Sequence, residues 1–143
     1  MKLAIGCDHA GYEMKEKIKD FLYTKGDIEI YDFGTNSNQS VDYPEFGHAV
    51  AKKVISDNVK GIVVCGSGIG ISIAANKVKG IRAALCTTAE HAEMSRKHND
   101  SNVLALGART TAYEEIKNII DVWLSTQFEG GRHLDRINKI ENV

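Results

Sequence analysis

Short apolar runs rich in β-branched residues alternate along the chain with longer segments whose apolar residues recur at helical spacing. The short runs predict strands over residues 2–7, 28–33, 61–65, 81–86 and 102–106. The longer segments predict helices over residues 12–23, 43–55, 69–78, 89–96, 111–126 and 131–140. In the first of these helices one face collects the apolar side chains Met14, Ile18, Phe21 and Leu22.

Strands that read as continuous apolar runs, with helices between them, indicate a parallel sheet covered on both faces. We therefore predict one α/β domain over residues 1–143, a three-layer αβα sandwich of Rossmann-like type with a sheet of about five strands. In such sheets ligands bind beyond the carboxyl ends of the strands, near the point where the strand order switches. The last helix, about residues 131–142, follows a Gly-Gly pair and is expected to contact a partner subunit.

Composition narrows the classes of protein. The 18 Lys and Arg residues against 19 Asp and Glu give a net charge of −1, which provides no broad cationic surface for nucleic acid or anionic membranes. No apolar stretch approaches the ~20 residues that span a bilayer. The apolar run at residues 3–5 ends at Asp8, too early for a secretory signal. Three widely spaced cysteines suggest free thiols in a reducing compartment, so we expect a compact, soluble, cytoplasmic protein.

The sharpest local feature is the loop Cys-Gly-Ser-Gly-Ile-Gly at residues 65–70. Three glycines between a strand and a helix let backbone N–H groups converge on an anion, although a generic glycine turn remains an alternative. The loop lacks the Gly-Lys-Ser/Thr of a Walker A motif, and Ile71 stands where a dinucleotide fingerprint needs glycine. Cysteines at helix N-termini are commonly activated, so Cys65 is a candidate nucleophile or base. Cys7 and Cys86 fit small buried apolar residues better.

Histidines and arginines add further candidates. His9 follows the first strand, and His98 suits proton transfer at neutral pH, as imidazoles do. Arg132 and Arg136 are four residues apart on a predicted helix, so they project from one face and can clamp a phosphate. Solvated surface arginines are the plainer alternative. No His-x-His or His-Glu-x-x-His motif occurs, so we expect no metal site.

Several of these stretches together resemble the type B ribose-5-phosphate isomerases, within the family that includes galactose-6-phosphate isomerase subunits. The matching stretches are GCDHAG at 6–11, DYP at 42–44, CGSGIGISIAANK at 65–77, GIRA at 80–83, RKHNDSNVL at 96–104 and EGGRH at 129–133. They span nearly the whole chain in the expected order. The resemblance implies an aldose–ketose isomerisation, without metal or cofactor, between D-ribose 5-phosphate and D-ribulose 5-phosphate.

The family's residue roles carry over onto the matching positions. By this resemblance Cys65 is the base that moves a proton between C2 and C1 through an enediolate, and the amides of residues 66–70 stabilise the oxyanion. His98 resembles the acid that opens the furanose ring, with Asp8 and Ser67 helping. The positions that match substrate contacts are Asp8, His9, Tyr43, Gly66, Ser67, Gly68, Ile69, Gly70, Asn99, Arg109, Arg132 and Arg136. The last two arginines reach a site shared between subunits, which implies a homodimer or a dimer of dimers.

One loop position departs from the family pattern. Ser67 stands where threonine is usual; the hydroxyl is kept and a methyl is lost, so we expect altered sugar packing or rate. Some relatives use a carboxylate base in the helix after the loop. Residues 73–76 contain no acid here, which favours Cys65 as the base.

Three alternatives remain open. A hexose-6-phosphate isomerase would need more room around Tyr43 and Ser67. A non-catalytic phosphate- or nucleotide-binding module would use the loop amides and arginines without the thiol. A redox sensor built on Cys65 would need Cys7 or Cys86 as its resolving thiol.

Overall fold

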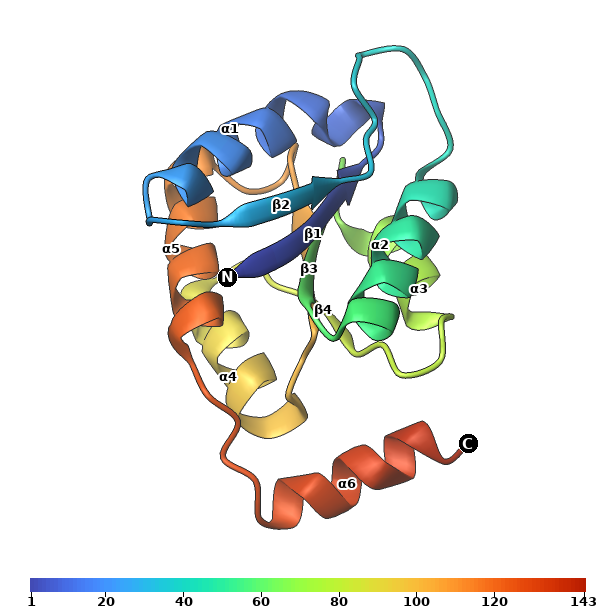
Figure 1. The fold of residues 1–143 in the computed structure, drawn as a ribbon, viewed down its shortest axis with the longest axis vertical. Coiled ribbons are helices and arrows are strands. Elements are labelled where there is room, and N and C mark those ends of the chain that lie inside the picture. Colours follow the sequence, from blue (N-terminus) through green and yellow to red (C-terminus); the bar gives the residue numbers. More distant parts are fainter.

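The computed structural model describes residues 1–143, which form a single five-stranded sheet with helices around it (Figure 1). The strands are β1 (Lys2–Cys7), β2 (Glu29–Asp32), β3 (Lys60–Cys65), β4 (Ala83–Leu85) and β5 (Val103–Gly107). The helices are α1 (Tyr12–Tyr23), α2 (Tyr43–Asp57), α3 (Ile69–Asn76), α4 (Ala89–Asn99), α5 (Tyr113–Ser125) and α6 (Arg132–Glu141), with a short 3₁₀ helix, η1 (His9–Gly11), before α1. All neighbouring strands run parallel in the order β2-β1-β3-β5-β4. The predicted α/β fold class is confirmed.

Helices cover the sheet on both faces and complete the three layers. In Figure 1, α1, α4 and α5 lie on one side of the strands, and α2 and α3 on the other. The first side encloses a core that includes Leu104 and Trp123, and the second a core that includes Val50. Successive strand residues point to opposite faces, so β3 places Val64 in the first core and Cys65 in the second. None of the helices is both long and apolar enough to cross a bilayer.

Most element boundaries fall within a few residues of the predicted ones, and the differences have local causes. α4 continues past residue 96 and ends where Asp100 takes a left-handed conformation with a φ of 45°. β4 is shorter than the predicted 81–86, because the N–H of Arg82 donates to the side chain of Asn102 at 2.8 Å instead of pairing with a strand.

The buried face of α1 differs from the predicted one. Ile18 and Leu22 are fully buried as expected, but Met14 and Phe21 are only partly buried. The third fully buried side chain of this helix is Lys15. Positions 15, 18 and 22 form the line that faces the sheet, whereas the apolar periodicity indicated Met14 and Phe21 and did not include a lysine.

α6 lies apart from the three layers, near the end of α4 (Figure 1). Its only buried residue is Ile137. At its start the ring of His133 stacks on that of His98 with centroids 4.6 Å apart, and at its end Glu141 pairs with Arg82 at 2.7 Å. Few apolar contacts therefore hold this helix, and polar contacts tie it at both ends.

Candidate functional site

The candidate site lies at the carboxyl end of β3, the central strand. Cys65 ends this strand and pairs in register with Gly107 at the end of β5. On the other side, β1 pairs Cys7 with Val64, so Asp8 follows beside Cys65. The chain leaves β1 toward β2 on one side and returns to β3 on the other, which makes this edge the switch point where open α/β sheets bind ligands.

The loop after β3 holds the thiol of Cys65 against the start of α3. Gly68, the N-cap of α3, has a φ of 79°, and a Cβ at this position would lie 2.8 Å from the carbonyl carbon of Leu106. Only glycine suits this conformation and this close approach. The N–H of Gly68 donates to the Sγ of Cys65 at 3.2 Å, and the Cys65 side chain is buried. When the sulfur is deprotonated, this becomes a charge-assisted hydrogen bond at a helix N-terminus.

The remaining loop amides are not all equivalent. The N–H of Ile69 donates to the Oγ of Ser67 at 3.2 Å, and the helical ladder begins with the N–H of Ser72 bonded to the carbonyl of Gly68. The amide of Gly70 lies ahead of this ladder and has no partner within the helix. Of the five amides at residues 66–70 that were expected to bind the oxyanion, two already bind the thiol and the serine hydroxyl. Fewer amides are therefore left to bind a ligand than the sequence suggested.

Tyr43 reaches the loop because of Gly70. It is the first residue of α2, and a Cβ on Gly70 would lie only 2.6 Å from the Cζ of the Tyr43 ring. The tyrosine is 40% exposed, so its ring packs on the loop while one side remains open to solvent. Because Gly70 has no side chain, the ring of Tyr43 can pack against the loop and form one wall of the site.

Asp8 and His9 are held by the short helix η1, which the sequence patterns did not indicate. The Oδ1 of Asp8 accepts the N–H of Gly11 at 3.1 Å, and the carboxylate caps the helix. The Nδ1 of His9 accepts the N–H of Val41 at 3.1 Å, from the segment before α2. Both side chains are therefore fixed by backbone groups at the carboxyl edge of the sheet.

Arg109 joins the site from the turn after β5. Its N–H donates to the carbonyl of Gly66 at 2.9 Å, and its side chain lies close enough to contact a Cβ placed on Gly66 at 3.6 Å. Beside it is a cavity of about 490 Å³, lined by His9, Ala10, Glu13, Met14, Lys17, Asn38, Ala108 and Arg109. Its volume is within the range of small-molecule sites.

Three polar residues of this cavity were missed from the sequence, namely Glu13, Lys17 and Asn38. Glu13 and Lys17 are four residues apart at the start of α1, so they project from one face of the helix just after His9. This spacing could have been recognised in the sequence, and it places both side chains at the same edge of the sheet as His9. Asn38 lies in an irregular segment, where no periodicity indicates direction.

The other predicted residues lie at the opposite edge of the sheet. His98 and Asn99 end α4, which runs from the carboxyl end of β4 back to the amino end of β5. Arg132 and Arg136 project from α6, which contacts this end of α4. A six-residue strand separates the two edges by about 20 Å. Within one chain, these four residues are therefore not brought to Cys65.

The two stacked histidines form the centre of this second cluster. Burial, together with the neighbouring charges of His98 and Arg132, lowers the pKa of His133 below its ordinary value of 6.5. Arg132 and Arg136 are exposed. The cluster therefore exposes two guanidinium groups to solvent, close to a pair of stacked imidazole rings. Across the whole chain, no group of three His, Cys, Asp or Glu residues could hold a metal ion.

The other two cysteines are buried on the opposite face of the sheet from Cys65. Burial raises the pKa of the Cys7 thiol to about 12 and that of Cys86 to about 11. Both fit the predicted role of small buried side chains. Because the sheet itself separates them from Cys65, neither is placed to resolve an oxidised Cys65, which removes the redox-sensor alternative.

Comparisons with known proteins agree with this geometry. A family model described as Ribose/Galactose Isomerase matches residues 3–140. The ribose-5-phosphate isomerase B of Escherichia coli (strain K12) is 48% identical over 143 residues, which cover 99% of this chain and 95% of that protein. The structure of Clostridium thermocellum ribose-5-phosphate isomerase B has a TM-score of 0.97 at 55% identity, covering 99% of this chain and 96% of that one. The Mycoplasma genitalium enzyme, solved with bound ribulose-5-phosphate, has a TM-score of 0.94 at 40% identity, covering 99% and 94%. This chain belongs to the ribose/galactose isomerase family.

Proposed function

We propose that this chain interconverts D-ribose 5-phosphate and D-ribulose 5-phosphate, with the thiolate of Cys65 as the base. The observation that carries this proposal is the place of the Cys65 sulfur, buried at the switch point and bonded to the amide of Gly68 at 3.2 Å. Family membership and the relatives that are named ribose-5-phosphate isomerase B support the same reaction.

The chemistry asks for a base that can serve both carbons in turn. The Cys65 thiolate takes the proton from C2 of the open-chain aldose, and the electron pair moves through an enediolate. The resulting Cys65 thiol exchanges its proton with solvent and delivers a proton to C1, while the proton of the C2 hydroxyl moves to the C1 oxygen, so the ketose is formed without any net change in oxidation state. The negative charge on the enediolate oxygen needs fixed donors, and the amide of Gly70 is available for this at the start of α3.

Ring opening needs a second proton carrier near the anomeric carbon. We assign this role to His98, with Asp8 and the Ser67 hydroxyl on the side of Cys65. Because His98 lies at the other edge of its own sheet, the residue that acts on a given Cys65 belongs to a second copy. The working enzyme is then a homodimer or a dimer of dimers with shared sites.

The phosphate group would be held from both sides of such a site. His9 and Arg109 line the cavity beside the loop in one chain. Arg132 and Arg136 of the partner subunit supply two further cations from one face of α6, with Asn99 at the neighbouring helix end. We place this reaction in the cytoplasm, in pentose phosphate metabolism, which agrees with three cysteines that are all free thiols.

The test is isomerisation of ribose 5-phosphate in deuterated water by the wild-type protein and by Cys65→Ala. Wild type should form ribulose 5-phosphate and introduce deuterium at the exchanging carbon. Cys65→Ala should lower kcat by about 10³-fold, the scale of a lost general base. Cys86→Ala, which also removes a buried thiol, is the matched control and should keep its turnover. Near-normal turnover and isotope exchange by Cys65→Ala would contradict the assignment of the base, and the absence of both turnover and exchange in wild type would favour the binding-only alternative.

The family description also includes galactose, so a hexose phosphate is the second candidate substrate. Tyr43 packs on Gly70 and leaves little freedom on that side of the loop. We therefore expect kcat/KM for ribose 5-phosphate to exceed that for allose or galactose 6-phosphate. Parallel turnover measurements on five- and six-carbon sugar phosphates decide between them.

A further inference from the structure

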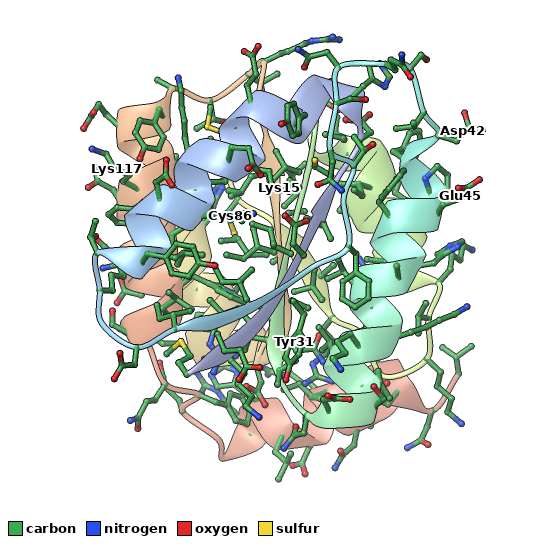
Figure 2. The ribbon with its side chains drawn as sticks, turned by 45° about the horizontal axis from the view of Figure 1, so that its top comes forward. Lys15, Tyr31, Asp42, Glu45, Cys86 and Lys117 are labelled. Atoms are coloured by element: carbon green, nitrogen blue, oxygen red, sulfur yellow. The ribbon has the colours of Figure 1, made fainter.

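Lys15 is the most unusual charged residue in the chain. It occupies a core position of α1, between the sheet and the helix, and its side chain has no exposed surface. Figure 2 shows it on the inner side of α1, facing the strands. An apolar residue would be expected at this position, so the lysine needs an explanation.

The ammonium group of Lys15 is bound to two residues at the end of β2 and just beyond it. Its Nζ donates to both carboxylate oxygens of Asp32, at 2.8 and 2.9 Å, and to the Oδ1 of Asn36 at 3.3 Å. Burial raises the pKa of Asp32, but hydrogen bonds from two lysines and a backbone amide outweigh it and lower the pKa overall. A buried ion pair of this kind seldom adds more stability than well-packed apolar side chains would. A role in fixing geometry is therefore the better explanation.

What the lysine fixes is the β2–α2 segment, residues 33–42. In Figure 1 this segment rises beyond the end of β2 and descends to the start of α2. At its root, the N–H of Gly34 donates to the Oδ1 of Asp32 at 2.8 Å, the same carboxylate that Lys15 holds. The N–H of Thr35 donates to the carbonyl of Cys7 at 2.7 Å, which ties the segment to the end of β1. Lys15 thus holds the start of this segment beside the end of β1, the strand that Asp8 and His9 follow.

Near its far end the same segment touches the site. The N–H of Val41 donates to the Nδ1 of His9 at 3.1 Å. A ring nitrogen that accepts an N–H carries no proton, so the neutral imidazole carries its proton on Nε2. His9 lines the same cavity as Arg109. Its Nε2–H is therefore a donor, which suits the acceptor oxygens of a sugar phosphate.

We propose that Lys15 is a positioning residue: by holding Asp32 and Asn36 it places the Val41 amide on His9, which fixes the Nε2–H tautomer of that histidine. The consequence for turnover rests on the proposed isomerase function, whereas the tautomer does not. Lys15 touches no substrate and acts only through the β2–α2 segment.

The test is Lys15→Met, which keeps the buried stem and removes the charge, compared with Lys19→Met. Lys19 bonds the same Asp32 carboxylate at 2.9 Å, so it is a matched control for losing one lysine from this carboxylate. The protein is labelled with ¹⁵N in its histidine side chains, and ¹H–¹⁵N spectra are recorded at about pH 8, where imidazoles are neutral. These spectra distinguish the two tautomers. The His9 signals are identified by their loss in His9→Gln.

In Lys15→Met we expect both His9 tautomers and a fall in kcat/KM of roughly 10- to 100-fold, the scale of a misplaced contact residue. Lys19→Met should keep the single tautomer and the wild-type kcat/KM. A folded Lys15→Met with an unchanged His9 tautomer overturns the proposal, whatever its turnover. If Lys15→Met does not fold, the exposed Asn36→Ala decides, with a mixed tautomer expected and an unchanged one against the proposal. Because the spectra are read without substrate, failure of the proposed function would leave the tautomer result intact.

Discussion

The two edges of the sheet carry two different kinds of site. At the carboxyl edge, Cys65 and Asp8 are buried and each is held by a backbone amide. At the amino edge, Arg132 and Arg136 are exposed on a helix with one buried residue. In the proposed mechanism the first edge carries the groups that transfer the proton, and the second contributes further cations for the phosphate. In that mechanism neither edge alone forms a complete site.

The two edges also differ in how the fold holds them. The loop at residues 65–70 sits on the central strand, between the strands on either side, so core packing defines its position. α6 depends on contacts at its ends, the His98–His133 stack and the Arg82–Glu141 pair. Its apolar side chains Leu134 and Ile140 are about half exposed, at 49% and 52%. In the proposed shared site, a second copy would cover these side chains.

The largest predicted effect is on the turnover of a hybrid dimer in which one chain is defective at the carboxyl edge and the other at the amino edge. A purified hybrid of one Cys65→Ala chain and one Arg132→Met/Arg136→Met chain should recover about half of the wild-type turnover, because one of its two sites has both intact parts. Each parent alone should show below about 1% at subsaturating substrate. Turnover of tag-purified hybrids measures this directly.

The matched control places all three substitutions in one chain and pairs that chain with wild type. If sites are shared, both sites of this hybrid are defective and its turnover stays low. If each chain forms its own site, the pattern reverses, since the wild-type chain works and the first hybrid does not. The two hybrids together therefore separate shared sites from separate ones.

A smaller effect should distinguish anion binding from proton transfer. Arg136→Met is expected to raise KM for ribose 5-phosphate by about 10- to 100-fold with little change in kcat, the scale of one lost charge-assisted hydrogen bond. Lys139→Met removes a cation from the same exposed helix and should leave KM unchanged. A loss in kcat alone would mean that Arg136 acts at the reacting carbons and would contradict the division between the edges.

The carboxyl edge was the more predictable of the two. Apolar runs placed the strands, and the residues after them had to meet at one edge of a parallel sheet. The same reasoning puts His98 at the amino edge, since it directly precedes a strand, and only the family resemblance joined it to Cys65. The clamp by Lys15 could not be predicted, because its partners Asp32 and Asn36 lie 17 and 21 residues away and periodicity carries no information about such pairs. The short helix η1 depends on one cap, the Asp8 carboxylate, and the pattern of apolar residues gives no indication of such a cap.

The smallest predicted effect is a pH dependence confined to the amino edge. Burial and the charge of His98 lower the pKa of His133 in the folded chain, and both effects are lost when α6 detaches, so detached α6 binds the proton more readily than docked α6. Docking is therefore fully supported above the ordinary value of 6.5 and weakens as pH falls through 6.5 toward the lower folded value. Hydrogen exchange at the amide of Ile137, corrected for intrinsic rates, should be faster at about pH 5 than at about pH 8 by less than tenfold. His133→Gln should flatten this dependence and His91→Gln, an exposed histidine of α4, should not; equal slopes in all three proteins would show that α6 docks independently of the stacked rings.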